Sequence, residues 1–294
     1  MSKIFVCGLV NLETDCAVDG FPISYSPVDY NFYGIRSVAS GVGLNVSLAL
    51  STLSDEVTLM SYAANDAAGA VIREAVRSIA RPVLLPCAQT PQSCVLFDHS
   101  GARRVYTDLK DMQERALLEE DFRPYADADA YVICNINFAR PLLTPACATG
   151  RPVFTDVHCL SDVHDPYNAD FMRAADVLFM SNEHIRGTEE YFVRAISATY
   201  PPSVIVVGMG ADGALLYERK DDRFTHIPAM HLSRVVNTVG AGDALFSAFT
   251  HFFLKGEPPA RALTLATAFA SVKIGCSGAS NGFLSETELY QRLY

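Results

Sequence analysis

The sequence lacks paired cysteines, runs of basic residues and long apolar segments. Its eight cysteines are scattered, and none forms a Cys-x-x-Cys pair, which is typical of a reduced, cytoplasmic protein. His158, Cys159 and His164 do not have the spacing of zinc ligands. We therefore expect free thiols and no structural zinc.

Charge and hydropathy argue against two further classes of partner. The formal net charge is −10 and the pI is near 5.1, and the densest basic pair is Arg103-Arg104, so nucleic acids and anionic membranes are not expected. No apolar run approaches the roughly 18 residues that span a bilayer. The N-terminal MSKIFVCGLV also lacks the length and flanks of a signal peptide. These features predict a cytoplasmic protein.

Short apolar segments rich in β-forming residues alternate with helical patterns. Half of the 294 residues are apolar, enough for a sizeable core in one large or two modest domains. Helical spacing is clearest around Val46–Leu53 and Ala68–Ile79, and Ser285 with Glu288 forms a capping box before the last helix. The alternation predicts a mostly parallel sheet covered by helices on both faces. The expected strands are 3–9, 56–63, 129–136, 152–157, 176–181 and 203–208.

Two segments interrupt this alternation. Residues 12–37 are rich in Tyr, Pro and Phe and have no helical period, and residues 93–107 are typical of a hairpin with Ser100-Gly101 at the turn. Neither fits a strand–helix–strand unit. We expect them to form a small β subdomain beside the main sheet.

A Gly-x-Gly-x-x-Gly pattern occurs at Gly208, Gly210 and Gly213. After a strand, this pattern can bind a dinucleotide, as in an oxidoreductase. Here the glycines precede ALLYERKDD, which has the pattern of a strand rather than a helix. We therefore favour a glycine-rich hairpin turn, which can still approach a nucleotide closely.

A second glycine segment, Gly240-Ala241-Gly242, leads directly into Asp243 and the apolar helix DALFSAFTHFFL. The backbone N–H groups of Ala241, Gly242 and Asp243 stand at a helix start, where an anion can bind. Asp243 would repel a bound phosphate unless it removes a proton from the hydroxyl that attacks the phosphate. The alternative is that Asp243 only complements the helix dipole.

A third glycine segment, SGVGLN, contains Gly41, Gly43 and Asn45. The glycines permit close approach by a ligand, and the Asn45 amide offers both a donor and an acceptor. The alternative is a tight strand–helix packing turn with Asn45 as an ordinary polar residue of the first helical turn.

The motifs GVGLN, GMGADG and NTVGAGD, in this order, resemble those of the ribokinase family, the PfkB-type carbohydrate kinases, and the resemblance extends over essentially the whole chain. It implies an α/β, Rossmann-like three-layer fold with a mostly parallel sheet and a small β lid. The core would comprise residues 1–11, 38–92 and 108–294, and the lid residues 12–37 and 93–107. It also implies an ATP-dependent kinase of a small sugar that uses Mg²⁺.

The resemblance further implies a role for each matching residue. Asp243 would be the general base, and Gly240, Ala241 and Gly242 would belong to the anion hole. The other implied sites are a sugar site at Asn11, Glu13, Gly41, Gly43 and Asn45, a nucleotide site at Gly208, Gly210 and Gly213, and Mg²⁺ held through water by Asn182 and Glu183. The alternative for Asn182 is that it or Ser181 caps a helix.

Several positions depart from the family pattern. Glu13 stands where an Asp is usual. Asn237 replaces the Asp that opens the late motif and helps to bind a monovalent cation, so activation by such a cation is doubtful. Ile185 occupies the Glu position of the Asn-x-x-Glu motif, and Gly208 replaces a common Thr. These changes weaken the expected cation, magnesium and phosphate contacts.

The substrate and the catalytic status stay open at the level of sequence. The aromatic residues Tyr25, Tyr30, Phe32 and Tyr33 would stack on a nucleobase in a nucleoside kinase, or else pack as the lid's own core or against the lid of a second copy in a homodimer. Arg103 and Arg104 would meet a phosphate on the substrate or simply be solvated. A non-catalytic sugar or nucleotide sensor is the alternative from another class, and Asp243 argues against it.

Overall fold

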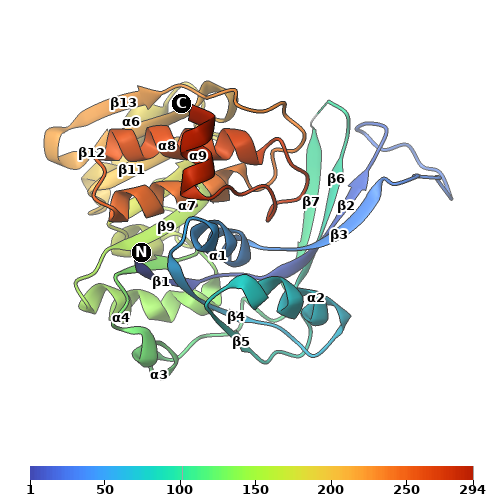
Figure 1. The fold of residues 1–294 in the computed structure, drawn as a ribbon, viewed down its shortest axis with the longest axis horizontal. Helices are drawn as coiled ribbons and strands as arrows, with labels where there is room; N and C mark the ends of the chain where they lie inside the picture. Colours follow the sequence, from blue (N-terminus) through green and yellow to red (C-terminus); the bar gives the residue numbers. More distant parts are fainter. Residues whose placement is uncertain (101, 294) are drawn as a thin grey trace.

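A nine-stranded sheet forms the centre of the molecule (Figure 1). The computed structural model describes residues 1–100 and 102–293. The strand order is β13-β12-β11-β10-β9-β8-β1-β4-β5, parallel throughout except for β12 and β13. The six predicted strands are confirmed, and the sheet gains β5, β12 and β13. The bounds are β1 Lys3–Cys7, β4 Glu56–Tyr62, β5 Arg81–Leu85, β8 Ala130–Ile133, β9 Val153–Cys159, β10 Val177–Ser181, β11 Val204–Gly208, β12 Ala214–Glu218 and β13 Arg223–Ile227.

Helices cover both faces of this sheet, which confirms the predicted three-layer α/β fold. Each face has its own apolar core, since alternate strand residues such as Val6 and Phe5 pack on opposite sides. One layer contains α1 Val42–Thr52, α2 Ala67–Ala75, α7 Ala241–Leu254, α8 Pro259–Lys273 and α9 Glu286–Leu293. The other contains α3 Glu119–Phe122, α4 Leu143–Ala148, α5 Ala169–Ala174 and α6 Glu189–Thr199. Short 3₁₀ turns occupy Val76–Ser78, Arg123–Tyr125, Asn137–Leu142, Gly210–Asp212 and Arg219–Asp221.

The apolar helix after the late glycine segment lies at the heart of one layer. α7 packs between α1 and α8, and Phe246 meets Phe179 of β10 edge-on at a centroid distance of 4.9 Å. This burial fixes the position of the α7 N-terminus. The predicted capping box of α9 is also confirmed, because the Ser285 N–H donates to Glu288 at 2.8 Å and the Glu288 N–H donates to the Ser285 hydroxyl at 3.3 Å.

A second sheet projects from one side of the molecule (Figure 1). Its order is β3-β2-β6-β7, with β2 Asn11–Ala17, β3 Ile35–Ser40, β6 Gln92–Phe97 and β7 Arg103–Asp108. The β6–β7 pair is the predicted hairpin, although Gly101 of its expected turn lies outside the described residues. The strands begin and end within a few residues of the expected lid segments.

The aromatic side chains between β2 and β3 do not form a core of the small sheet. Tyr25, Tyr30, Phe32 and Tyr33 are all exposed, and among them only Tyr30 and Phe32 are recorded in contact, stacked at a centroid distance of 6.2 Å. The expectation that they pack as the lid's own core is therefore wrong. Among the described residues, the structure has no helix with the length and apolarity needed to cross a bilayer.

Candidate active site

The candidate residues gather at the carboxyl edge of the parallel strands, where open α/β sheets bind their ligands. Asn11 follows β1 by a short loop, Asn182 follows β10, and Gly210 follows β11. The N-termini of α1 and α7 reach the same edge, because each helix returns across the sheet from it. Topology therefore brings together segments far apart in the sequence.

The N-terminus of α7 presents free backbone donors to this edge. Gly240 is the N-cap, with a left-handed φ of 77°, and a Cβ there would lie 2.6 Å from the carbonyl oxygen of Ala279. Among the described residues, no acceptor is found for the N–H groups of Gly242 and Asp243, whereas the Ala241 N–H donates to the Thr238 carbonyl at 3.2 Å. The predicted anion site therefore has two free donors rather than three.

Space lies open in front of these donors. Gly242 is exposed, and a Cβ added to it would meet no atom within 4 Å. The helix start combines two unpaired N–H groups with the positive end of the α7 dipole. This combination suits an anion such as a phosphoryl group.

Asp243 is held by a residue from the other predicted glycine segment. The Asn45 Nδ2 donates to Asp243 Oδ2 at 2.7 Å, so α1 and α7 meet through this bond. Desolvation raises the pKa of the Asp243 carboxyl; the Asn45 hydrogen bond and nearby His158 oppose this rise, while Asp156 adds to it. The side chain keeps some exposure to solvent. A partly exposed carboxylate with a raised pKa is suited to proton removal near neutral pH.

A row of polar side chains on β2 faces the same region. Asn11, Glu13 and Asp15 alternate along the strand and are buried on one face of the small sheet. The Asn11 Nδ2 donates to the Ser93 hydroxyl at 2.7 Å, and the Ser40 hydroxyl donates to Glu13 Oε2 at 3.3 Å. Asp15, which the sequence reasoning missed, extends this acidic row beyond the residues of the motif.

Burial and neighbouring charge change the acidity of the β2 carboxyls. The pKa of Glu13 rises from 4.5 to about 7, through desolvation first and then repulsion by Asp15, partly offset by the bond from Ser40. The pKa of Asp15 is also raised by burial, against the opposing charges of Arg36 and Lys273. A bound molecule that donates hydrogen bonds to these two carboxyls would offset the free-energy cost of burying them.

Three buried acceptor atoms near this row have no partner among the described residues: Glu13 Oε1, Asp15 Oδ1 and Asn45 Oδ1. Buried acceptors without donors are rare and costly in proteins. All three require hydrogen-bond donors such as hydroxyl groups. The donor set therefore suits a hydroxyl-rich ligand.

The glycines of SGVGLN have mainly a packing role. Gly41 has a φ of 104°, and a Cβ there would lie 2.5 Å from the Leu9 carbonyl oxygen. A Cβ on Gly43 would lie 2.6 Å from the carbonyl carbon of Gly8, and the Gly43 N–H donates to the Leu9 carbonyl. The tight-turn interpretation is thus confirmed for these two glycines. Their close packing is what places Asn45 within reach of Asp243.

The glycine pattern after β11 lies on a hairpin. β11 pairs antiparallel with β12, so Gly208, Gly210 and Gly213 do not open a helix that could bind a dinucleotide pyrophosphate. A Cβ on Gly213 would lie 2.1 Å from the Ile227 carbonyl, whereas one on Gly210 would meet nothing within 4 Å. Gly213 therefore closes the turn, and Gly210 leaves open space at the carboxyl edge.

The residues after β10 differ from the predicted arrangement. Asn182 is buried and its Nδ2 donates to Glu189 Oε1 at 2.9 Å, so its carboxylate partner lies seven residues further along, at the start of α6. Burial raises the pKa of Glu189, but the Asn182 bond, backbone N–H bonds and the charge of Arg186 together outweigh it, so the pKa is lowered. Glu183 is exposed and accepts from the Cys159 thiol at 3.1 Å. The helix-cap alternative is wrong, because α6 begins at Glu189 with Thr188 as N-cap.

Three charged or titratable residues near Asp243 escaped the sequence reasoning. Asp156 and His158 lie in β9, and the His158 N–H donates to Asp156 Oδ1 at 2.7 Å. Both influence the pKa of Asp243. Lys273, at the end of α8, does so as well. The signal for the β9 pair was its place at a strand's carboxyl end, where parallel sheets concentrate function.

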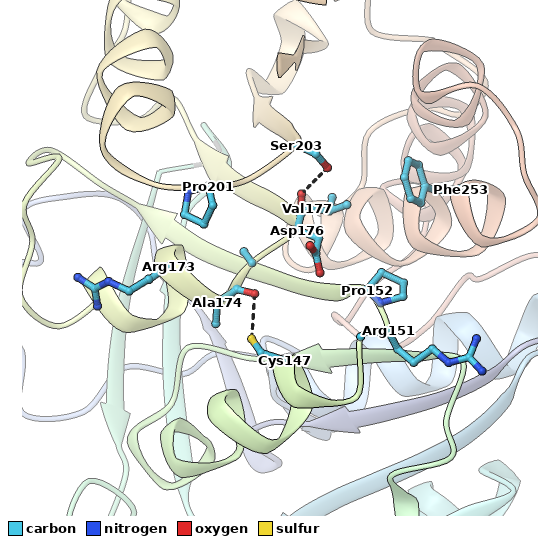
Figure 2. A pocket seen from close by; sticks show the side chains of 12 residues that line it. Cys147, Arg151, Pro152, Arg173, Ala174, Asp176, Val177, Pro201, Ser203 and Phe253 are labelled. Atoms are coloured by element: carbon cyan, nitrogen blue, oxygen red, sulfur yellow. Dashed lines mark hydrogen bonds between the residues drawn. The ribbon is translucent and has the colours of Figure 1, made fainter. Parts of the chain in front are cut away.

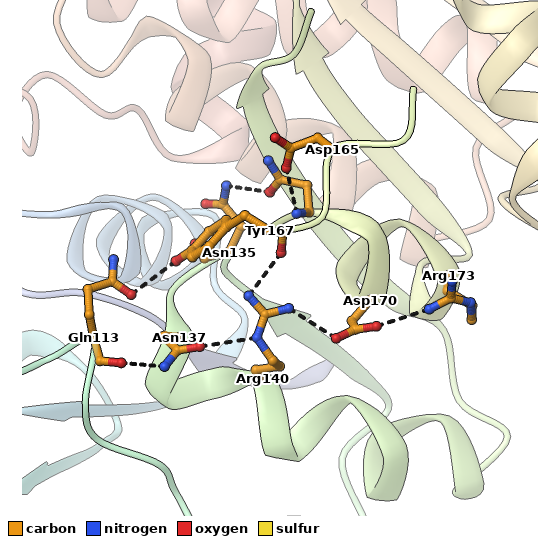
Figure 3. Close-up of polar contacts among 9 residues, drawn as sticks. Gln113, Asn135, Asn137, Arg140, Asp165, Tyr167, Asp170 and Arg173 are labelled. Carbon is orange, nitrogen blue, oxygen red and sulfur yellow. Dashed lines mark hydrogen bonds and ion pairs between the residues drawn. The ribbon is translucent and has the colours of Figure 1, made fainter. Parts of the chain in front are cut away.

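A polar network braces the loops that follow β8 and β9 (Figure 3). The Arg140 guanidinium donates to Asn137 Oδ1 at 3.1 Å, to the Tyr167 carbonyl at 2.9 Å and to Asp170 at 3.2 Å. The Tyr167 hydroxyl donates to the Asn135 carbonyl at 3.1 Å. One arginine thus joins the loops that follow β8 and β9 at the carboxyl edge of the sheet.

A pocket of about 470 Å³ lies away from this chemistry, at the amino ends of β9, β10 and β11 (Figure 2). Arg151 and Arg173 contribute to its rim, but their guanidinium groups point to opposite sides. One carboxylate oxygen of Asp176 accepts a hydrogen bond from the Val153 N–H at 2.8 Å. The polar groups of this pocket do not point toward a common centre, so the carboxyl edge of the sheet is the better candidate site.

Comparisons with known proteins find carbohydrate kinases among the similar chains. Residues 168–287 match the family described as pfkB family carbohydrate kinase. A 1-phosphofructokinase of Haloferax volcanii is 35% identical over 152 residues, which are 52% of this chain but only 37% of that protein. An ATP-dependent ribose-1-phosphate kinase of Halopiger xanaduensis is 24% identical over 95% of this chain and 94% of its own. The structure of the microbiome-derived acarbose kinase Mak1 superposes with a TM-score of 0.89 at 24% identity, covering 99% of this chain and 98% of that one.

Proposed function

We propose that this chain, whose residues 168–287 belong to the pfkB carbohydrate kinase family, is an ATP-dependent kinase that phosphorylates a hydroxyl group of a small sugar. The observation that carries the proposal is Asp243. This carboxylate stands beside two free N–H donors at a helix start and is oriented by Asn45. A base and an anion site are the two parts that phosphoryl transfer to an alcohol requires.

Each part of the site has a separate task. Asn45 fixes the Asp243 carboxylate, which removes the proton of the attacking hydroxyl as the new phosphorus–oxygen bond forms. The bond between the γ-phosphorus and the oxygen that bridges it to the β-phosphate breaks at the same time, and ADP leaves. The N–H groups of Gly242 and Asp243 stabilise negative charge on the transferred phosphoryl group, and Gly240 and Ala241 hold the turn that presents them. The helix dipole adds to this stabilisation without reorganising during the reaction.

The substrate site is built for a neutral, hydroxyl-rich molecule. Glu13, Asp15 and Asn45 each offer a buried oxygen that lacks a donor, and Asn11 stands on the same strand face. Sugar hydroxyls would supply the missing donors, whereas a phosphate would be repelled by the two carboxyls. We therefore rank unphosphorylated sugars above sugar phosphates, and Gly41 and Gly43 shape the wall behind them.

The nucleotide and its metal would lie across the sheet edge. The end of β11 and the hairpin turn after it, with Gly208, Gly210 and Gly213, would lie beside the phosphates. Among the described residues, no group of three or more His, Cys, Asp or Glu side chains could hold a metal directly, which suits Mg²⁺ bound mainly to phosphates and water. Asn182 and Glu183 would orient that water, and Glu189 steadies Asn182. The metal would supply charge neutralisation of the phosphates.

Nucleosides are the second candidate class. The exposed rings of Tyr25, Tyr30, Phe32 and Tyr33 are free to stack on a base. The same rings would serve a homodimer formed through the lid. That dimer, the division into core and lid, and the cytoplasmic location stay predictions.

The test measures ADP release from Mg-ATP across unmodified pentoses and hexoses, their phosphates, and nucleosides. Wild type runs beside Asp243→Asn, which keeps the size of the side chain but removes the base. For the best substrate we expect kcat to fall roughly 10²–10⁴-fold in the variant. Asp221→Asn, at the exposed β12–β13 turn, is the matched control and should retain wild-type kcat.

Two outcomes would contradict the proposal. Full activity in Asp243→Asn would remove the base from the mechanism. A panel on which wild type shows no turnover, while a sugar still raises the melting temperature, would favour the non-catalytic sensor instead.

A further inference from the structure

Lys273 carries a buried positive charge that the proposed reaction does not use. It is the last residue of α8, and its side chain is fully buried. The Nζ donates to the carbonyl oxygens of Val239 and Gly278, the latter at 2.9 Å. A lysine at this depth is unusual, because a buried charge requires specific compensation.

The compensation comes from carbonyl groups. Within residues 1–100 and 102–293, no carboxylate oxygen lies within 4.0 Å of the Lys273 Nζ, so it forms no ion pair. Backbone carbonyl oxygens are also the groups that proteins offer to a monovalent cation, and two of them accept from the Lys273 ammonium. Here the cation is attached covalently to the chain.

The two carbonyls belong to the segments that shape the α7 N-terminus. Val239 immediately precedes Gly240, the N-cap of α7. Gly278 immediately precedes Ala279, whose carbonyl lies against Gly240. The ammonium therefore ties together the two loops that set the position of the free N–H groups. The N–H groups of Val236 and Asn237 add bonds of 2.8 and 3.1 Å to the Ile274 carbonyl, next to Lys273.

We propose that Lys273 is a built-in monovalent cation: a positioning residue that holds the glycine turn of the phosphoryl site and makes activity independent of potassium. The catalytic part of this inference rests on the proposed kinase function. The bonds from Lys273 to the Val239 and Gly278 carbonyls, called the clamp below, are a structural property, and the melting temperature tests them separately. Asn237 is consistent with it, since a neutral side chain at this loop suits a site that is already filled by a lysine.

The charge of Lys273 also acts on the acids around it. It lowers the pKa values of Asp243, Glu13 and Asp15 relative to what burial alone would produce. Burial lowers the pKa of Lys273 itself, whereas the charges of Asp243, Cys276, Glu13 and Asp15 oppose this lowering. Lys273 thus helps to keep the proposed base ionised.

The experiment replaces the internal cation by external ones. Wild type, Lys273→Ala and Lys273→Met are compared in choline, sodium, potassium, ammonium and methylammonium chloride, with kcat, KM and melting temperature measured in each. Alanine leaves room for a small cation, whereas methionine fills the space without charge. Lys220→Ala, at an exposed position, controls for the loss of a lysine.

Wild-type kcat should vary less than about twofold among the salts. In choline, Lys273→Ala should lose on the order of 100-fold in kcat, as expected when catalytic donors are displaced by about 1 Å, with little change in KM for ATP. Ammonium, methylammonium or potassium should restore most of kcat and raise the melting temperature of Lys273→Ala, but should do neither for Lys273→Met.

The inference is overturned if wild type needs potassium, if Lys273→Ala keeps its kcat in choline, or if no cation raises either its kcat or its melting temperature. Should Lys273→Ala fail to fold in every salt, a Lys273→Met variant that folds with wild-type kcat would overturn the inference, and one that folds with reduced kcat would support it. Absence of kinase activity in wild type would refute the proposed function, while the cation-dependent melting temperature of Lys273→Ala would still decide the clamp.

Discussion

Replacing Glu13 by Gln should stabilise the protein at neutral and alkaline pH while weakening substrate binding. The Glu13 carboxyl is buried beside Asp15, and its pKa rises from 4.5 to about 7, mainly through desolvation. Gln keeps the shape and one acceptor oxygen but has no charge to desolvate. The stability gain should therefore appear only above the pH at which Glu13 ionises in the unfolded wild type.

The magnitude follows from the two pKa values. The unfolded chain releases the proton near pH 4.5 and the folded chain near pH 7, so the folded state binds more protons in between and its stability falls as pH rises through this window. A rise of about 2.5 in pKa at about 1.4 kcal/mol for each unit is worth about 3 kcal/mol above pH 7. Below pH 4.5 the contribution vanishes.

Urea unfolding of wild type and Glu13→Gln at a series of pH values from 4 to about 8.5 measures this difference. The gap in the free energy of unfolding should open between pH 4.5 and 7 and then stay constant. Glu190→Gln, at an exposed position of α6, should show no such gap. A Glu13→Gln difference that is the same at pH 4 and pH 8 would refute the reasoning, as would a loss of stability at pH 8. The KM for the sugar should rise in Glu13→Gln, because one charged acceptor is lost.

Two further predictions concern the α1–α7 junction. In Asn45→Ala, the donor that favours the ionised form of Asp243 is lost. The pKa of Asp243 should therefore rise further, and the acid limb of the kcat–pH profile should move to higher pH. An acid limb at the wild-type pH would show that Asn45 does not influence the base. In Gly240→Ala, the new Cβ would lie 2.6 Å from the Ala279 carbonyl oxygen, on a residue with a φ of 77°. The variant should lose about 1–3 kcal/mol of stability in thermal or urea unfolding, and its kcat should fall. Wild-type stability in this variant would show that the turn relaxes to accept the side chain.

The sequence predicted what depends on local pattern. The alternation of apolar strands and helices identified the three-layer fold, and the strand-like residues after Gly213 correctly favoured a hairpin over a dinucleotide site. The glycine turn before Asp243 predicted an anion site because a helix start needs no tertiary context to expose its N–H groups. The count of free donors was wrong by one, since the bond between Ala241 and Thr238 depends on the turn geometry.

Pairings across the fold were beyond the reach of sequence spacing. Asn45 and Asp243 are 198 positions apart, and their contact exists only because Gly43 lets α1 pack closely on the β1–β2 segment. Asn182 has its carboxylate partner at Glu189 rather than in the adjacent turn, because no helix begins at Asn182. Helical spacing pairs residues three or four positions apart, so it does not predict a contact across the seven positions from Asn182 to Glu189.

The distribution of charge at the site explains why its stabilising and catalytic demands conflict. Asp243, Glu13 and Asp15 are each less acidic than an exposed carboxyl because they lie away from water. Among the residues that the structure describes, Lys273 supplies the buried positive charge of this group. A packed core without these groups would be more stable, since unpaired buried acceptors contribute nothing to folding. A bound sugar would donate to those acceptors, and a phosphoryl group would meet the free N–H groups of α7. Binding of both substrates would therefore offset part of the energetic cost of burying these groups.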